Sequence, residues 1–123
     1  MKRFVIATIL LVAGASIATA QMNGDLLHQG WLSYQMTLEG LTKDAPAAIF
    51  AAGVFSGYVL AISDTYAHIP VGTPNTQIMR VVGAFLDSHP NIQNERGSKV
   101  ILEALQEAYP PPPPVSKQDK SKE

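Results

Sequence analysis

Histidine is the residue type in this chain with the greatest capacity to bind a metal ion, and the chain has three, His28, His68 and His89. Two ligands on one helix face usually appear as an H-x-x-x-H or E-x-x-H pair. None of the three histidines belongs to such a pair, and the chain has no cysteine. We therefore predict no metal site and no cofactor. We interpret His28 as a partly exposed side chain beside an apolar helix face, and His89 as a cap for helix-end carbonyl groups.

Ser56 and Asp64 are the other residues considered for catalysis. Ser56 lies in a G-V-F-S-G run that is only superficially similar to a nucleophile elbow, because the G-x-S-x-G order is missing and no strand precedes it. Asp64 has no second carboxylate at helical spacing for acid–base work. Asp87 and His89 are two residues apart and so lie on different sides of a helix. We therefore predict no catalytic residues and no enzyme, with Ser56 as a small packing residue.

The composition is that of one small globular domain. The chain has 123 residues, of which 46% are hydrophobic and 15% charged, and compact domains usually have about 100–200 residues. The formal net charge is -1. Because phosphate binding needs clustered Lys and Arg, we predict no nucleic-acid partner.

The first twenty residues have the pattern of a secretory signal peptide. Lys2 and Arg3 precede an uncharged run, Phe4–Ile17, and the small residues Ala18–Ala20 follow as a cleavage site. The polar sequence that begins at Gln21 favours cleavage near Ala20 over an uncleaved anchor. We therefore predict export, with residues 1–20 as a signal peptide.

The other end of the chain is rich in proline. Pro110–Pro114 is an unbroken run of prolines, which ends a helix and favours polyproline II. We interpret residues 110–123 as a disordered, proline-rich tail, with a motif for a proline-binding partner as the alternative. The predicted folding unit, residues 21–109, has four positive and eight negative side chains. Its surface therefore suits a basic partner.

Helical periodicity and helix-end residues predict an all-α fold, a small four-helix domain. Gly40 is placed to end the first helix. Asp44 and Thr73 are the expected N-caps of the second and third, each shortly before a proline. Pro90 ends the third, because the residue before proline is disfavoured in the α region. No segment has the period of a strand. The expected helices cover about residues 25–38, 45–67, 74–88 and 91–109.

The second predicted helix has no charged residue from Ala45 to Ser63. That length is close to the roughly 20 apolar residues of a membrane span, but the segment is rich in alanine, glycine and serine. Bulky residues and small residues form two separate stripes on it. We therefore predict a central helix of a soluble bundle with neighbours on both sides, and keep a small-residue membrane interface as the alternative. The bulky stripe comprises Phe55, Tyr58, Ile62 and Tyr66, and the small stripe Gly53, Gly57 and Ala61.

Four motifs between residues 56 and 110 occur in a characteristic order. They are a G-Y-hydrophobic segment from Gly57-Tyr58 to Asp64, the seven-residue spacing from Pro70 to Gln77, the V-V-x-x-F-L-x-x-H-P block ending at His89-Pro90, and A-L-x-x-A-Y-P ending at Pro110. This series resembles the Tai-type family of type VI secretion amidase immunity proteins. The match covers about 55 residues, and the series as a whole is fairly specific.

The resemblance implies a small helical protein of the periplasm that binds and blocks a peptidoglycan-cleaving amidase, and it implies a homodimer. From the interpretation of the second helix as part of a soluble bundle, we predict no membrane association once the signal peptide is removed. Family members usually carry cysteines near the positions of His68 and Pro111, where this chain has none. The covalent tie expected there is missing, which marks a divergent member whose core or dimer interface has to supply the lost stability.

Residue roles follow from the resemblance and from position. Gly57 and Tyr58 are expected to lie at a close helix crossing. Pro70 is expected to shape a loop, and His89-Pro90 to fix the turn before the last helix. The alternative function is a general periplasmic helical protein, chaperone-like or structural, without an amidase target. The predicted structural motif comprises Gly57, Tyr58, Asp64, Pro70, Gln77, His89 and Pro90. The predicted partner-binding residues are Asn75, Asp87, Ser88, Asn91 and Gln93.

Overall fold

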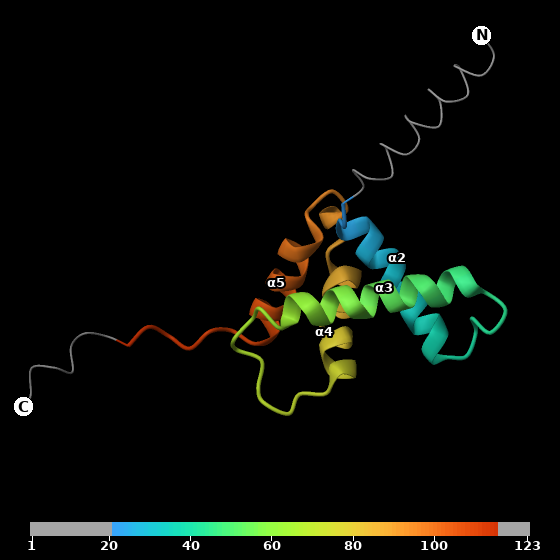
Figure 1. Ribbon diagram of the computed structural model, residues 1–123. Coiled ribbons are helices and arrows are strands. Elements are labelled where there is room, and N and C mark those ends of the chain that lie inside the picture. Colours follow the sequence, from blue (N-terminus) through green and yellow to red (C-terminus); the bar gives the residue numbers. More distant parts are fainter. Residues whose placement is uncertain (1–20, 116–123) are drawn as a thin grey trace, which may run out of the picture.

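Helices dominate the computed structural model, which describes residues 21–115 (Figure 1). Within that range the chain forms four α-helices and one 3-10 turn and no strand, which confirms the predicted all-α fold. The predicted signal peptide, residues 1–20, and residues 116–123 of the tail lie outside the described residues. The elements are α2 (Gly24–Leu38), α3 (Pro46–Ser63), α4 (Asn75–Ser88), η1 (Pro90–Ile92) and α5 (Gly97–Ala108).

Helix α2 begins and ends at residues suited to those positions. The Asn23 side chain accepts a hydrogen bond of 2.9 Å from the Leu26 amide and so satisfies one of the free donors of the first turn. After Leu38 the chain turns at Gly40, whose φ of 73° lies in the left-handed region that glycine adopts without strain. The predicted stop at Gly40 is confirmed.

The predicted N-caps of the next two helices are wrong. Ala45 precedes α3 and Pro74 precedes α4, and neither helix start has a side-chain cap. Thr73 instead donates its hydroxyl to the Pro70 carbonyl at 2.7 Å, within the preceding turn. The α3 start tolerates the missing Asp44 cap in part because its first residue is proline, which has no amide hydrogen to satisfy.

Helix α3 ends at Ser63, four residues before the predicted end. Two hydroxyl groups bond to carbonyls of its last turn: Ser63 to Leu60 at 2.8 Å and Thr65 to Ile62 at 2.7 Å. The amides of Thr65 and Tyr66 bond three residues back, to the Ile62 and Ser63 carbonyls at 3.0 Å each, so the α-helical pattern ends there in a tighter turn.

The last helix begins at Gly97 rather than near Asn91. The intervening segment is held by backbone hydrogen bonds to the chain at the start of α2. The Gln93 carbonyl accepts from the Asp25 amide at 3.1 Å, and the Glu95 carbonyl accepts from Gly24 at 2.9 Å. Because these carbonyls are used across the fold, they are not available to a continuous helix.

One hydrophobic core joins all four helices. Helix α3 contacts α2, α4 and α5, and in Figure 1 it lies across them. Burial of each apolar side chain of this size contributes about 1.5–3 kcal/mol relative to exposure. The largest fully buried side chains are Phe55, Leu27, Ile101, Leu105, Val59, Val82 and Val100.

Only one face of α3 takes part in this core. Ala52, Phe55, Val59 and Ser63 are buried, whereas the opposite face is exposed, and no other element passes in front of it in Figure 1. The prediction of neighbours on both sides is therefore wrong for the single chain. Among the described helices, α3 is the one with the length and composition of a membrane span.

Candidate protein-binding surfaces

Close helix crossings occur at glycines that the sequence analysis did not single out. A Cβ on Gly30 would lie 2.8 Å from the Cβ of Phe55, and one on Gly83 would lie 2.2 Å from the Trp31 ring. These two positions bring α2 against α3 and α4. Gly57, the predicted crossing residue, has nothing within 4 Å of such a Cβ. Within one chain, the prediction for Gly57 is wrong.

Asp87 joins α2 and α4. Its Oδ2 accepts a hydrogen bond of 3.1 Å from the Trp31 indole, and its Oδ1 lies 3.1 Å from His28 Nε2. The Trp31 ring is also packed against Tyr34 and Phe55, at centroid distances of 5.9 and 6.0 Å. Both carboxylate oxygens of Asp87 are therefore engaged within the chain, although its side chain is half exposed.

The end of α4 is closed by its own side chains. His89 Nδ1 lies 2.8 Å from the Phe85 carbonyl, and the two rings stack with centroids 3.9 Å apart. The Ser88 hydroxyl donates to the Ala84 carbonyl at 3.0 Å. Pro90 then starts the 3-10 turn η1. The Ser88 hydroxyl also lies 3.1 Å from the Phe85 carbonyl. Ser88 and His89 thus both reach this carbonyl, which belongs to the last turn of the helix and has no helical amide of its own.

The segment between α4 and α5 presents amide side chains from a fixed backbone. Asn91, Gln93 and Asn94 are exposed, and we call these three residues the α4–α5 end surface. Besides the two hydrogen bonds to α2, the Gly97 amide donates to the Met22 carbonyl at 2.9 Å. The surface is therefore held in place before any partner binds.

The predicted partner-binding residues lie at two places. Asp87, Ser88, Asn91 and Gln93 are near the end of α4, whereas Asn75 is its first residue. A helix of this length spans about 20 Å. The five residues therefore do not form one surface, and Asn75 belongs with the loop between α3 and α4.

That loop is shaped by a tight turn. The Pro70 carbonyl accepts hydrogen bonds from the Thr73 amide and hydroxyl, and Gly72 has a φ of 86°. Val71 at the tip is fully exposed. Asp64 is the exposed C-cap residue of α3, and Gln77 is exposed on the first turn of α4.

The start of the loop is tied to the end of α5. The Tyr66 hydroxyl donates a hydrogen bond to the Tyr109 carbonyl, and the Tyr66 ring packs edge-on against His68. These two segments are the ones where the family resemblance places a pair of cysteines. A noncovalent link therefore joins them in this chain.

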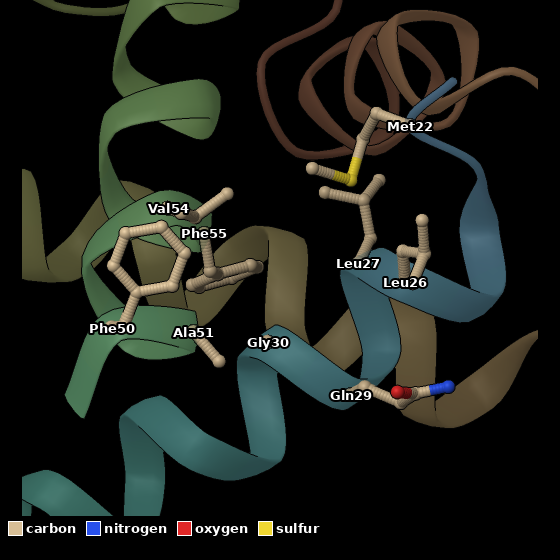
Figure 2. Close-up of a pocket in the computed structure, with 9 residues that line it drawn as sticks. All are labelled: Met22, Leu26, Leu27, Gln29, Gly30, Phe50, Ala51, Val54 and Phe55. Carbon is tan, nitrogen blue, oxygen red and sulfur yellow. The ribbon is translucent and has the colours of Figure 1, made fainter. Parts of the chain in front are cut away.

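An apolar groove of about 250 Å³ lies between α2 and α3 (Figure 2). In Figure 2, Phe50 and Val54 of α3 face Leu26 and Leu27 of α2 across it, with Met22 above. Phe50 is 74% exposed. Gln29 also lines the groove, and its side-chain amide donates a hydrogen bond of 2.9 Å to the Asp25 carboxylate. Such a groove suits apolar side chains of another protein. It was not predicted from the sequence, because it forms only where α2 and α3 pack together.

The described residues offer little for catalysis. They contain no group of three metal-ligating side chains. Ser56, considered as a nucleophile, donates its hydroxyl to the Ala52 carbonyl of its own helix at 2.8 Å. The apolar groove and the exposed amide groups are suited to contacts with another macromolecule.

The family comparison agrees with that description. The model of the Rap1a immunity proteins matches residues 27–111, about two thirds of the chain and nearly the whole helical domain. No curated protein and no solved structure matches the chain significantly. The predicted type VI secretion immunity role is thus confirmed at the level of the family, whose members bind a partner effector protein and are generally not enzymes. The chain belongs to the Rap1a immunity protein family of type VI secretion.

Proposed function

We propose that the mature chain is a periplasmic immunity protein that acts as a homodimer and inhibits a type VI secretion peptidoglycan amidase. The observation that carries the proposal is the family match over residues 27–111. The signal-peptide pattern in the sequence of residues 1–20 supports export, and a wall-cleaving effector acts outside the cytoplasm. The motif series shared with the Tai-type proteins supports an amidase as the target.

The α4–α5 end surface, Asn91, Gln93 and Asn94, is the proposed contact for the effector. Its amide groups donate and accept hydrogen bonds. Because the backbone beneath them is held by hydrogen bonds to the start of α2, binding costs little ordering of this segment. The described residues carry four positive and eight negative side chains, which favours approach to a basic partner.

Inhibition needs no chemistry from this chain. A rigid protein surface that covers the mouth of an active site excludes a large polymer such as peptidoglycan by volume alone. The free energy has to come from a few well-packed contacts. We therefore expect single substitutions at the contact to weaken protection, while the fold of the immunity protein stays intact.

The test uses cells that export, to their periplasm, the amidase effector encoded by the gene next to that of this chain, and it measures whether the chain protects them. Cells that also export the wild-type chain should survive, and the purified chain should slow release of peptidoglycan fragments by the amidase. Gln93→Arg should reduce both effects by at least about tenfold, which corresponds to about 1.4 kcal/mol of binding free energy. Gln106→Arg, at an exposed position of α5, is the matched control and should retain protection.

Circular dichroism of both variants establishes that they fold. Survival without the wild-type chain, or lysis in its presence, would contradict the proposed role. Equal protection by Gln93→Arg and Gln106→Arg would move the contact away from the α4–α5 end surface.

A further inference from the structure

The apolar groove between α2 and α3, which we call the α2/α3 groove, is open to solvent. Its walls face each other in Figure 2, with Leu26 on α2 and Phe50 and Val54 on α3. Leu26 is 43% exposed and Phe50 74% exposed. We infer that this groove receives an apolar side chain of the effector, carried beside a basic residue. The inference rests on the proposed function and names the place where the effector is anchored.

The α4–α5 end surface needs an apolar contact beside it. A specific protein interface covers about 800 Å² on each partner, which is more than three amide side chains supply. Most of the binding free energy comes from a few side chains that fill apolar pockets, and polar groups form the rim around them. Asn91, Gln93 and Asn94 are exposed and polar, so they suit the rim of such an interface.

The α2/α3 groove and the α4–α5 end surface meet at the first turn of α2. Leu26 and Leu27 of this turn line the groove, and the Asp25 amide bonds to the Gln93 carbonyl at 3.1 Å. Met22 also lines the groove, and a Cβ built on Gly97 at the start of α5 would lie 2.7 Å from its side chain. One partner can therefore fill the groove and contact the amide groups together.

The size of the groove favours a side chain as its occupant. Its volume of about 250 Å³ is below the roughly 300–1,000 Å³ of pockets that hold drug-sized ligands and cofactors. The lining is almost entirely apolar, and its base is closed where Gly30 packs against Phe55. A leucine, methionine or phenylalanine side chain of the effector gains most from such a site, because the hydrophobic effect is proportional to the apolar area that is covered.

The charge at the rim of the groove is negative. Asp25 is exposed and accepts a hydrogen bond from Gln29, which lines the groove. The nearby cations, Arg96 and Lys99, line a separate hollow on α5, and Lys99 Nζ lies 3.6 Å from carboxylate oxygens of Glu95 and Glu103. A basic residue beside the apolar anchor therefore matches Asp25. Anionic lipid headgroups are repelled by it.

Substitutions in the groove test the anchor. The purified mature chain is titrated with the effector encoded by the neighbouring gene, and the dissociation constant is measured. Leu26→Asp places a charge in the groove wall, and Ala51→Leu fills the groove with an apolar side chain. Each should weaken binding at least about tenfold. Leu32→Asp is the matched control, because Leu32 is also on α2 and 47% exposed but lies outside the groove; it should bind like the wild type. Circular dichroism checks that all three variants fold.

Alkylation measures directly whether the effector covers the groove. The chain has no cysteine, so Leu26→Cys and Leu32→Cys each introduce a single thiol. Saturating effector should slow the reaction of iodoacetamide at position 26 at least about tenfold and leave position 32 unchanged. Asp25→Asn retains an acceptor for Gln29 but removes the charge. It should therefore reduce the salt dependence of binding, and an unchanged salt dependence would contradict the basic character of the occupant.

Four results would overturn the inference. Leu26→Asp and Ala51→Leu chains that bind like the wild type, or an effector that leaves alkylation at position 26 unchanged, would refute the anchor and leave the immunity role standing. Protection of position 26 at high concentrations of the chain alone would assign the groove to a second copy. Flotation with phosphatidylglycerol vesicles that Leu26→Asp abolishes would assign it to lipid. A wild-type chain that does not bind the effector would instead refute the proposed function together with the anchor.

Discussion

The glycines of this domain provide matched substitutions with opposite expected effects. Gly83→Ala places a methyl group against the Trp31 ring, where a Cβ would lie 2.2 Å from the nearest ring atom. Gly53→Ala places the same methyl group where nothing lies within 4 Å. Both glycines are in helices, so the gain in helix propensity is the same, about 1 kcal/mol. The difference between the variants therefore measures the packing at Gly83.

The cost at Gly83 follows from the contacts of Trp31. Carbon atoms in contact are about 3.5–4.0 Å apart, so the ring has to move by more than 1 Å. Tyr34 and Phe55 pack against the ring, and Asp87 holds its indole nitrogen. Overpacking of this kind costs up to about 3 kcal/mol, and loss of the hydrogen bond adds about 1 kcal/mol. After the propensity gain is subtracted, Gly83→Ala should lower the free energy of unfolding by about 3 kcal/mol.

Urea and thermal unfolding followed by far-ultraviolet circular dichroism measure both variants. A domain of this size shifts its Tm by about 4–8 °C per kcal/mol. Gly83→Ala should therefore lower the Tm by about 12–24 °C, and Gly53→Ala, measured at low protein concentration, should raise it by about 4–8 °C. Equal shifts for the two variants, or a neutral Gly83→Ala, would refute the close crossing of α2 and α4.

Three other predictions concern two side-chain links between elements and the C-terminal tail. Asp87→Ala should lower the free energy of unfolding by about 1–2 kcal/mol in urea titrations, because the Trp31 indole loses its hydrogen-bond acceptor. The fluorescence emission of Trp31, the single tryptophan, should also shift, and an unchanged spectrum would contradict the contact. Tyr66→Phe removes the hydroxyl that donates to the Tyr109 carbonyl, so the free energy of unfolding measured by thermal unfolding should fall by about 1 kcal/mol. An unchanged stability would mean that the packing of the Tyr66 ring, and not its hydrogen bond, stabilises this link. Removal of residues 112–123 should leave the Tm unchanged, because residues 112–115 are exposed; a large drop in calorimetry would show that the tail packs on the domain.

Helical periodicity was sufficient to predict the number of helices and the fold class. In α4, Ile78, Val82, Phe85 and Leu86 are buried as their spacing predicts, and Val81 is partly buried. Pro90 likewise sets the end of α4, because that rule depends only on neighbouring backbone atoms. Local signals of this kind act within one or two helical turns, so they can be read from the sequence.

The start of the last helix was predicted wrongly because of competition from partners distant in sequence. The segment before Gly97 was expected to be helical, but its carbonyl groups bond to the start of α2. Asp87, a predicted partner-binding residue, also accepts hydrogen bonds from α2, although its side chain stays half exposed. In both cases a residue with a suitable local role is used by a helix that is more than fifty positions away in the chain.

The sequence by itself determined the four helices apart from some of their ends, which of their faces are apolar, and the family signature carried by residues 56–110. Only the tertiary structure decided which glycine lies under a neighbouring ring and which faces open space. Gly57 and Gly83 are both helical glycines among apolar residues, yet one is exposed and the other is against Trp31. The difference depends on how four helices share one core, because a helix with two apolar faces can bury either of them, and the choice is made by the shape of its neighbours.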